Sequence, residues 1–279
     1  MMAPMPSPTP PMVTSFANPR VKAAAALRDR RERDRSGLTL VDGAREVRRA
    51  LDAGASVAEA FVCESLVAGP DARAALDRLG SSGTTLQTIS EAIFAKLAFG
   101  QRSEGLVVVV RIPGTELDGL LLPHDPLVVV LEAVEKPGNL GAVLRSADAA
   151  AADAVIAASP RTDLFNPNAI RASAGTIFSI PLGAATSEAT LAWLAGRGVR
   201  IVAAKVDAAR MYTDADLTGP LALVLGAEAD GLSAAWGGTN IEDVRIPMLG
   251  VGDSLNVSVS AAILLYEARR QRGAPTGRL

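Results

Sequence analysis

The stretch LVVVLEAVEKPGNLGAVLRSADAAAADAVIAAS, residues 127–159, decides the fold of the C-terminal half of this 279-residue chain. It opens with an apolar, β-branched run, continues through a Pro-Gly turn into the helical pattern of residues 141–152, and ends in a second strand-like run, AVIAAS. Strand, helix and strand in this order are typical of an α/β sheet.

The same alternation continues toward the C-terminus. Residues 168–175 and 191–198 read as helices, 177–182, 199–206 and 221–226 as strands, and 257–272 as a long helix. The runs VVVL, IVAA and LALVL are continuous rather than alternating, as expected of parallel strands that are covered on both faces. We therefore expect a doubly wound α/β domain over residues 127–270. In such sheets ligands bind beyond the carboxyl ends of the strands.

The N-terminal half is predicted to be a separate, small α/β domain over residues 16–112. A helix should run from Pro19 to a stop at Gly37, and strands then alternate with helices as far as the β-branched run GLVVVVRI, residues 105–112. Residues 113–126 contain three Pro and two Gly and are predicted to be a linker. The Pro-rich residues 1–15 and residues 271–279 are expected to be tails.

Composition excludes several chemistries. One His and one Cys are too few for a Cys/His metal site or a disulfide framework, so no metal is expected. The formal net charge of −2 argues against a uniformly basic nucleic-acid binder. No apolar run reaches the length of a membrane helix, and the N-terminus lacks the basic region of a signal peptide. We expect a cytoplasmic protein that makes no membrane contact.

Three strand-to-helix junctions have unusual composition. EKPGNLGAVLRSADA, residues 135–149, places Gly138 and Gly141 where a backbone could approach a ligand. LVLGAEADGLS, residues 223–233, ends a strand at Gly226. VRIPMLGVGDSLNVSVSAAI, residues 244–263, leads a Gly-rich loop into an apolar helix. Each alone is explained by turns, caps and surface acids.

Together, NLGAVLRSADA, LGAEADGLS and IPMLGVGDSLNVSVSAAI resemble the three signature motifs of the SpoU/TrmH family of SPOUT-class RNA 2′-O-ribose methyltransferases. The segment NPRVKAAAALRDRRERDRSGLTLVDGAREV is similar to the L30e-like substrate-binding domain that precedes the catalytic domain in many members. The resemblance implies a SPOUT domain with a deep trefoil knot, S-adenosyl-L-methionine as cofactor, and a homodimer. In its domain layout and its arginine-rich composition, with 24 Arg and 4 Lys, the chain looks most like antibiotic-resistance 23S rRNA methyltransferases of the avilamycin or thiostrepton type.

The resemblance also assigns roles to residues. The cofactor would be held by backbone and apolar walls at Gly226, Ile246, Met248 and Leu255. Catalysis would involve Arg145, with Asn139, Glu228, Ser254 and Asn256 around it. A guanidinium group stays protonated in proteins, so a phosphate clamp by Arg145 is favoured over a general base. Glu228 could equally well bind loop backbone amides.

Substrate recognition is predicted to lie in the N-terminal domain. Residues 20–35 contain seven basic and three acidic side chains, a pattern that suits RNA-backbone contact and a solvated helix face equally well. The candidate RNA-binding residues are Arg28, Arg30, Arg31, Arg33 and Arg45. The predicted function is 2′-O-methylation of structured RNA, with 23S rRNA preferred. The alternatives are a tRNA methyltransferase of the same family and a non-catalytic ribosome-assembly factor.

Overall fold

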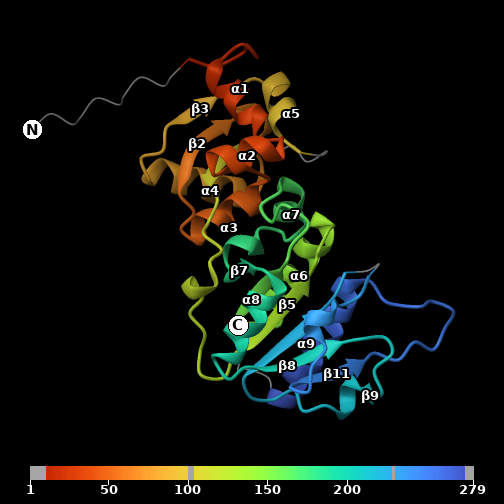
Figure 1. Ribbon diagram of the computed structural model, residues 1–279. Coiled ribbons are helices and arrows are strands. Elements are labelled where there is room, and N and C mark those ends of the chain that lie inside the picture. The colour runs from red at the N-terminus through yellow and green to blue at the C-terminus, as the bar shows by residue number, and fades with distance from the viewer. Residues whose placement is uncertain (1–10, 100–103, 228–229, 274–279) are drawn as a thin grey trace, which may run out of the picture. The chain divides into compact units, whose positions relative to one another are not determined.

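The computed structural model describes residues 11–99, 104–227 and 230–273. The chain forms two compact units that divide between Ile112 and Pro113 (Figure 1). Each unit has its own sheet and its own buried apolar core.

The first unit contains a four-stranded sheet of order β1-β4-β2-β3. Strand β4 is central and antiparallel to both neighbours, whereas β2 and β3 run parallel. The strands are β1 (Leu38–Asp42), β2 (Val57–Val62), β3 (Leu86–Thr88) and β4 (Leu106–Arg111). The helices are α1 (Pro19–Ala26), α2 (Arg30–Ser36), α3 (Ala44–Asp52), α4 (Gly69–Ser81) and α5 (Glu91–Leu97). The mixed α/β organisation predicted for residues 16–112 is therefore observed.

The single helix predicted between Pro19 and Gly37 is wrong in one respect, because the structure breaks it into α1 and α2. Asp29 begins the second helix as its N-cap, its side chain accepting a hydrogen bond from the backbone N–H of Arg31 at 2.8 Å. The first N–H groups of a new helix have no intrahelical acceptor, and a short acceptor side chain at the N-cap supplies one. Within a continuous helix these N–H groups would already be bonded to carbonyls of the preceding turn. Gly37 ends α2 at φ +64°, as its glycine identity predicts.

The second unit contains a seven-stranded sheet of order β7-β6-β5-β10-β8-β11-β9, and every neighbouring pair is parallel. The strands are β5 (Leu127–Glu132), β6 (Ala154–Ala158), β7 (Leu182–Ala185), β8 (Arg200–Ala204), β9 (Arg210–Met211), β10 (Leu221–Leu225) and β11 (Ile241–Arg245). The helices are α6 (Pro137–Ala149), α7 (Pro167–Ala172), α8 (Ser187–Ala195) and α9 (Val257–Arg272). The parallel α/β class predicted from the continuous apolar runs is confirmed.

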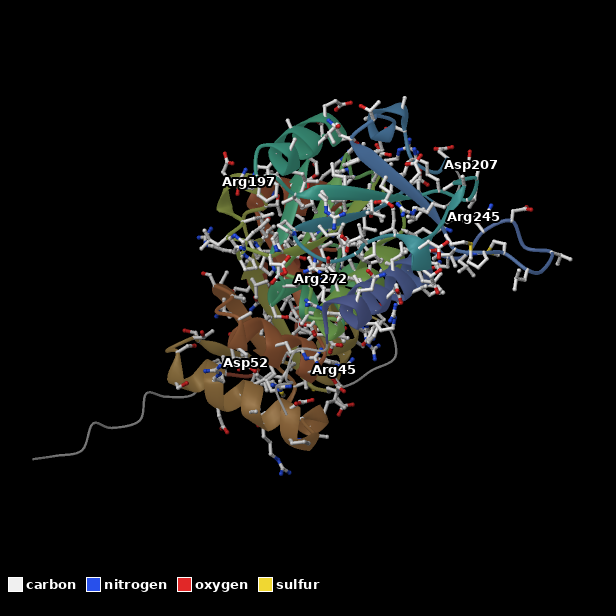
Figure 2. All side chains as sticks on the ribbon, turned by 90° about the horizontal axis from the view of Figure 1, so that it is seen from below. Arg45, Asp52, Arg197, Asp207, Arg245 and Arg272 are labelled. Atoms are coloured by element: carbon white, nitrogen blue, oxygen red, sulfur yellow. The ribbon has the colours of Figure 1, made fainter. Side chains whose placement is uncertain are left out.

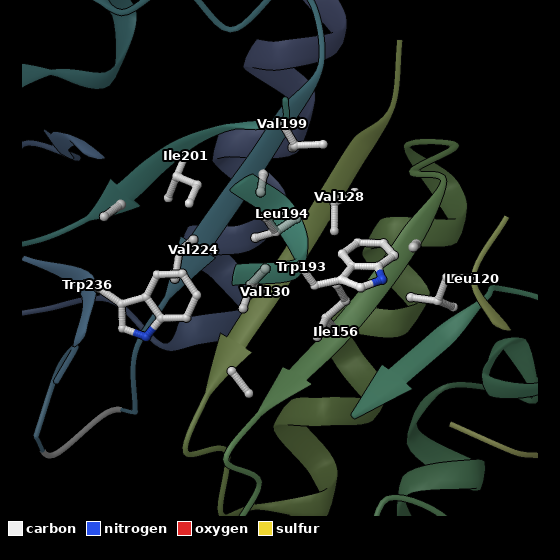
Figure 3. Packing of buried hydrophobic residues seen from close by; sticks show 14 residues of the cluster. Leu120, Val128, Val130, Ile156, Trp193, Leu194, Val199, Ile201, Val224 and Trp236 are labelled. Atoms are coloured by element: carbon white, nitrogen blue, oxygen red, sulfur yellow. The ribbon is translucent and has the colours of Figure 1, made fainter. Parts of the chain in front are cut away.

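Both faces of this sheet are covered. On one face, alternate residues of the central strands, such as Val128, Val130 and Val224, pack with Trp193 and Leu194 of α8 (Figure 3). Helices α6, α7 and α9 pack together, and α9 also contacts β10. Since side chains alternate across a strand, two covered faces require apolar residues at every position. The LALVL sequence of β10 meets this requirement, and all five of its residues are buried.

Three local expectations are corrected. The strand predicted at residues 177–182 starts later, because Thr176–Phe178 forms a 3-10 turn and β7 begins only at Leu182. Strand β11 was not predicted, since its sequence IEDVR lacks an apolar run. Residues 113–126, predicted to be a linker, pack on the second unit: the Ala184 N–H donates to the Thr115 carbonyl at 2.7 Å, and Leu120 is buried in the core.

The end of α9 is fixed to the second unit by Arg272, whose side chain is 7% exposed (Figure 2). Its guanidinium donates to the backbone carbonyls of Leu217 at 3.1 Å and of Asp125 and Pro126 at 3.3 Å. Burial lowers the pKa of Arg272. Helix α9 ends at Arg272, as predicted, so this helix extends two residues past the domain boundary expected at residue 270. No helix in the described part of the chain is long and apolar enough to cross a membrane.

Candidate functional site

A cavity of about 680 Å³ opens at the carboxyl ends of β8, β10 and β11. This is where ligands bind in parallel α/β sheets. Apolar side chains and bare backbone form most of its wall, and Lys205, Asp207, Asp230 and Asp253 bring charge to it. Asp207, which follows β8, is exposed (Figure 2). A volume of this size and a mixed lining suit a small organic ligand with polar ends.

The structure brings the four predicted cofactor-binding residues together in this cavity. Gly226 follows β10, Ile246 and Met248 follow β11, and Leu255 lies just before α9. Ser254, predicted as a catalytic residue, lines the same cavity. The second and third junctions of the sequence therefore meet in space because their strands belong to one parallel sheet.

Gly226 has no room for a side chain. A Cβ atom there would lie 2.2 Å from the carbonyl carbon and oxygen of Gly231 and 2.6 Å from the backbone nitrogen of Leu232. The loop turns back on itself, with the Gly231 N–H donating to the Ala227 carbonyl at 3.0 Å and Gly231 at φ +67°. Gly226 thus permits close backbone packing within the cavity wall, and Gly231 supplies the left-handed backbone conformation of the turn.

A second, smaller cavity of about 220 Å³ adjoins the first, with Gly226, Ala227 and Val257 lining both. Asn139, from the first motif, is part of its wall. The side-chain amide of Asn256 donates to the Asn139 Oδ1 atom at 3.2 Å. Asn256 is also the N-cap of α9, its Oδ1 accepting from the Ser258 N–H at 2.9 Å and the Ser258 hydroxyl at 2.6 Å. One hydrogen bond therefore links the first and third motifs.

One of the predicted catalytic residues, Arg145, is not placed at these cavities. Arg145 lies on an exposed position of α6 and lines neither cavity, and within the described part of the chain its guanidinium has no partner. Glu228 lies outside the described residues. Gly141, expected to approach a ligand, instead packs against α7, where a Cβ would lie 2.5 Å from that of Ala172.

Residues that sequence reasoning missed also follow strand ends. Lys205, just after β8, donates to Asp243 Oδ2 at 2.9 Å and to the Trp236 carbonyl at 3.1 Å. Glu132 ends β5 as a buried carboxylate, and Ser233 donates to it from the wall of the larger cavity. The signal was available, because a charged residue that closes an apolar strand is a candidate for the ligand-binding edge of a parallel sheet.

The predicted RNA-binding arginines differ in availability. Arg30 and Arg31 are exposed on α2. Arg28 donates to the Lys96 carbonyl at 2.6 Å and lies over the Phe99 ring, and Arg45 pairs with the buried Glu46 at 2.9 Å (Figure 2). The prediction that Arg33 contacts RNA is wrong, because this residue is 2% exposed and its guanidinium donates to the Leu27 and Arg28 carbonyls. It serves the α1–α2 junction, whose carbonyls need donors.

The residues at the larger cavity fit S-adenosylmethionine. The adenosyl part needs apolar walls and backbone hydrogen-bonding groups, which Ile246, Leu255 and the segment around Gly226 provide. Carboxylates on the rim suit its positive charge. Within the described residues, no group of three or more His, Cys, Asp or Glu is placed to hold a metal ion.

Comparison with known proteins gives two matched regions. Residues 126–266 match the SpoU rRNA methylase family, and residues 18–108 match the MRM3-like substrate binding domain. A 23S rRNA (guanosine-2′-O-)-methyltransferase, RlmB of Vibrio parahaemolyticus, is 36% identical over 203 residues, which cover 71% of this chain and 82% of that protein. A 23S rRNA (uridine(2479)-2′-O)-methyltransferase of Streptomyces viridochromogenes is 32% identical over 257 residues, 89% of this chain and 88% of that protein.

Among solved structures, an S-adenosylmethionine-bound rRNA methyltransferase from Sinorhizobium meliloti superimposes with a TM-score of 0.84 at 29% identity. The superposition covers 93% of this chain and 97% of that one. The match therefore spans both units, and the cofactor of that relative is the one that the cavity fits. On the three motifs, the fold and these relatives, the chain belongs to the SpoU rRNA methylase family.

Proposed function

We propose that this protein transfers a methyl group from S-adenosylmethionine to a ribose 2′-hydroxyl of 23S rRNA, in the cytoplasm. The observation that carries the proposal is the cavity at the ends of β8, β10 and β11, with Asn139 and Asn256 joined at the smaller cavity beside it. S-adenosylmethionine supplies an electrophilic methyl group. The work left to the chain is to hold two ligands in line and to make a poor nucleophile reactive.

The residues divide this work. Gly226, Ile246, Met248 and Leu255 hold the cofactor by backbone and apolar contact. Asn139 and Asn256, which fix one another at 3.2 Å, orient the ribose. Ser254 and Glu228 complete the site, and Arg145 binds the neighbouring phosphate and favours the developing alkoxide.

We include the homodimer and the knotted C-terminal part in this proposal. Arg145 is exposed and lines neither cavity of its own chain, so a second copy that covers α6 would bring this arginine to a site. An Arg145→Ala chain mixed with an Asn139→Ala chain tests this arrangement. If Arg145 acts in the site of the other subunit, the mixture should show about a quarter of wild-type activity, because half of the dimers are mixed and each mixed dimer has one intact site out of two. Arginine acting within its own chain restores none.

We propose that the exposed arginine side chains of α2 contact the RNA backbone. Replacing Arg30 and Arg31 by alanine should weaken RNA binding and flatten the slope of log affinity against log salt by about 1.4 to 1.8, because two phosphate contacts are lost. Cofactor affinity should not change. The matched control is the Arg73/Arg111→Ala double variant, which removes the same charge from two other exposed positions of the first unit. Equal slopes for the two variants would contradict this assignment.

One experiment tests the activity and separates its rivals. Purified protein is incubated with methyl-labelled S-adenosylmethionine and either 23S rRNA or total tRNA, and label in each RNA is counted. Label in 23S rRNA supports the proposal, and label in tRNA alone favours the tRNA methyltransferase. Absence of both label and calorimetric cofactor binding would point to an assembly factor. A resistance role is tested by the ribosome-targeting drug susceptibility of cells that express the protein.

A further inference from the structure

Glu132, the last residue of β5, is a buried carboxylate with 4% of its surface exposed. Its Oε1 atom accepts hydrogen bonds from the Ser187 and Ser233 hydroxyls, each at 2.6 Å, and its Oε2 atom accepts from the Ser233 N–H at 2.7 Å. In the described part of the chain its partners are hydroxyl and backbone N–H donors rather than cations. A buried charge of this kind persists only where donors replace its lost hydration.

These donors are sufficient to keep the group ionised. Burial raises the pKa of Glu132, but the hydrogen bonds from Ser187 and Ser233 outweigh burial and hold the pKa below the ordinary value of a glutamate. The carboxylate is therefore charged at neutral pH. A group held in this form is a fixed acceptor toward which the two serines are oriented.

The carboxylate joins elements that are distant in sequence. Register in the sheet pairs Leu131 with Leu225, so Glu132 stands beside Gly226, the first residue after β10. Ser187 is the first residue of α8, and Ser233 ends the loop that follows β10. Glu132 thus anchors the far end of that loop at the same sheet edge where the loop begins.

This loop forms a wall of the larger cavity. Gly231, Leu232 and Ser233 all line it, and the Gly231 backbone packs directly against Gly226. Glu132 itself does not line this cavity but lines the smaller one beside it. Any displacement of Ser233 would move the wall, since Ser233 is the residue at which the carboxylate holds the loop by two hydrogen bonds.

We propose that Glu132 is a positioning residue for the cofactor, acting through Ser233 to hold Gly231, Leu232 and Ser233 in place as a wall of the larger cavity. This inference rests on the proposed assignment of the larger cavity to S-adenosylmethionine. A purely structural Glu132 would contribute to the stability of the fold, and its loss would leave cofactor affinity of the folded protein unchanged.

The test is Glu132→Gln. Glutamine keeps the shape but offers only one acceptor oxygen, so the amide nitrogen must face either the Ser233 N–H or the two hydroxyls. The dissociation constant of S-adenosylmethionine, measured by calorimetry well below the melting temperature, should rise about tenfold, the scale of one charge-assisted hydrogen bond.

Ser187→Ala is the matched control, because it removes a 2.6 Å bond to the same carboxylate oxygen from the α8 side. It should lower the melting temperature but leave the cofactor dissociation constant within about twofold. If Glu132→Gln loses stability as the control does and binds the cofactor as tightly as wild type, the inference is overturned. If the wild-type protein binds no cofactor, the proposed function has failed instead.

A second pair of variants covers the case in which Glu132→Gln does not fold. Ser233→Ala and Ser187→Ala each remove one hydroxyl from the same carboxylate oxygen, and only Ser233 belongs to the cavity wall. A weaker cofactor complex in Ser233→Ala alone supports the inference. Equal cofactor affinity in the two variants overturns it.

Discussion

Arg145→Lys is expected to lower the rate of methyl transfer by about 100-fold to 1,000-fold, the usual cost of losing one donor that stabilises transition-state charge. Lysine keeps the positive charge but lacks the planar fork that grips a phosphate with two parallel hydrogen bonds. Cofactor affinity should be unchanged, because Arg145 does not line the larger cavity. Single-turnover rates with saturating RNA and cofactor measure the effect.

Asp148→Asn is the control for this variant, since it changes the charge of another exposed position on α6. Its turnover should remain close to wild type. Wild-type rates in Arg145→Lys would show that charge alone is sufficient, and the phosphate-clamp role would be wrong. A loss of cofactor affinity in Arg145→Lys would instead place the arginine at the cofactor.

Gly226→Ala is expected to weaken S-adenosylmethionine binding by about 10-fold to 100-fold, because overpacking of this kind costs roughly 1–3 kcal/mol. The added methyl would lie 2.2 Å from the Gly231 carbonyl group, and backbone on both sides leaves no flexible side chain to move away. The loop must shift, and the cavity wall shifts with it. Calorimetric titration with the cofactor measures the change.

Gly238→Ala provides the matched control, because a Cβ at Gly238 would meet nothing within 4 Å. This variant should bind the cofactor as wild type does. If Gly226→Ala also bound with wild-type affinity, the loop would be able to relax without disturbing the cavity, and the requirement for a bare backbone at this position would be refuted.

The fold class could be predicted from sequence because it depends on local signals. The LALVL run of β10 and the LVVVLE run of β5 are apolar at every position, which only strands buried on both faces require. Strand β11 was missed because IEDVR has no such run, and it joins the sheet by pairing with β8. The helix break at Asp29 was missed because capping competes with helix continuation on the scale of about 1 kcal/mol.

The candidate site, like the fold, could be predicted from the sequence only in part. Sequence alone determined the motifs, and their family resemblance pointed to Gly226, Ile246, Met248 and Leu255 as cofactor-binding residues. Only the tertiary structure decided which arginines are available: Arg33 is buried at the α1–α2 junction, whereas Arg30 and Arg31 are exposed. It also decided that Glu132 holds Ser233, 101 residues away. Burial and hydrogen bonding across such separations depend on strand order and register, which no local pattern encodes.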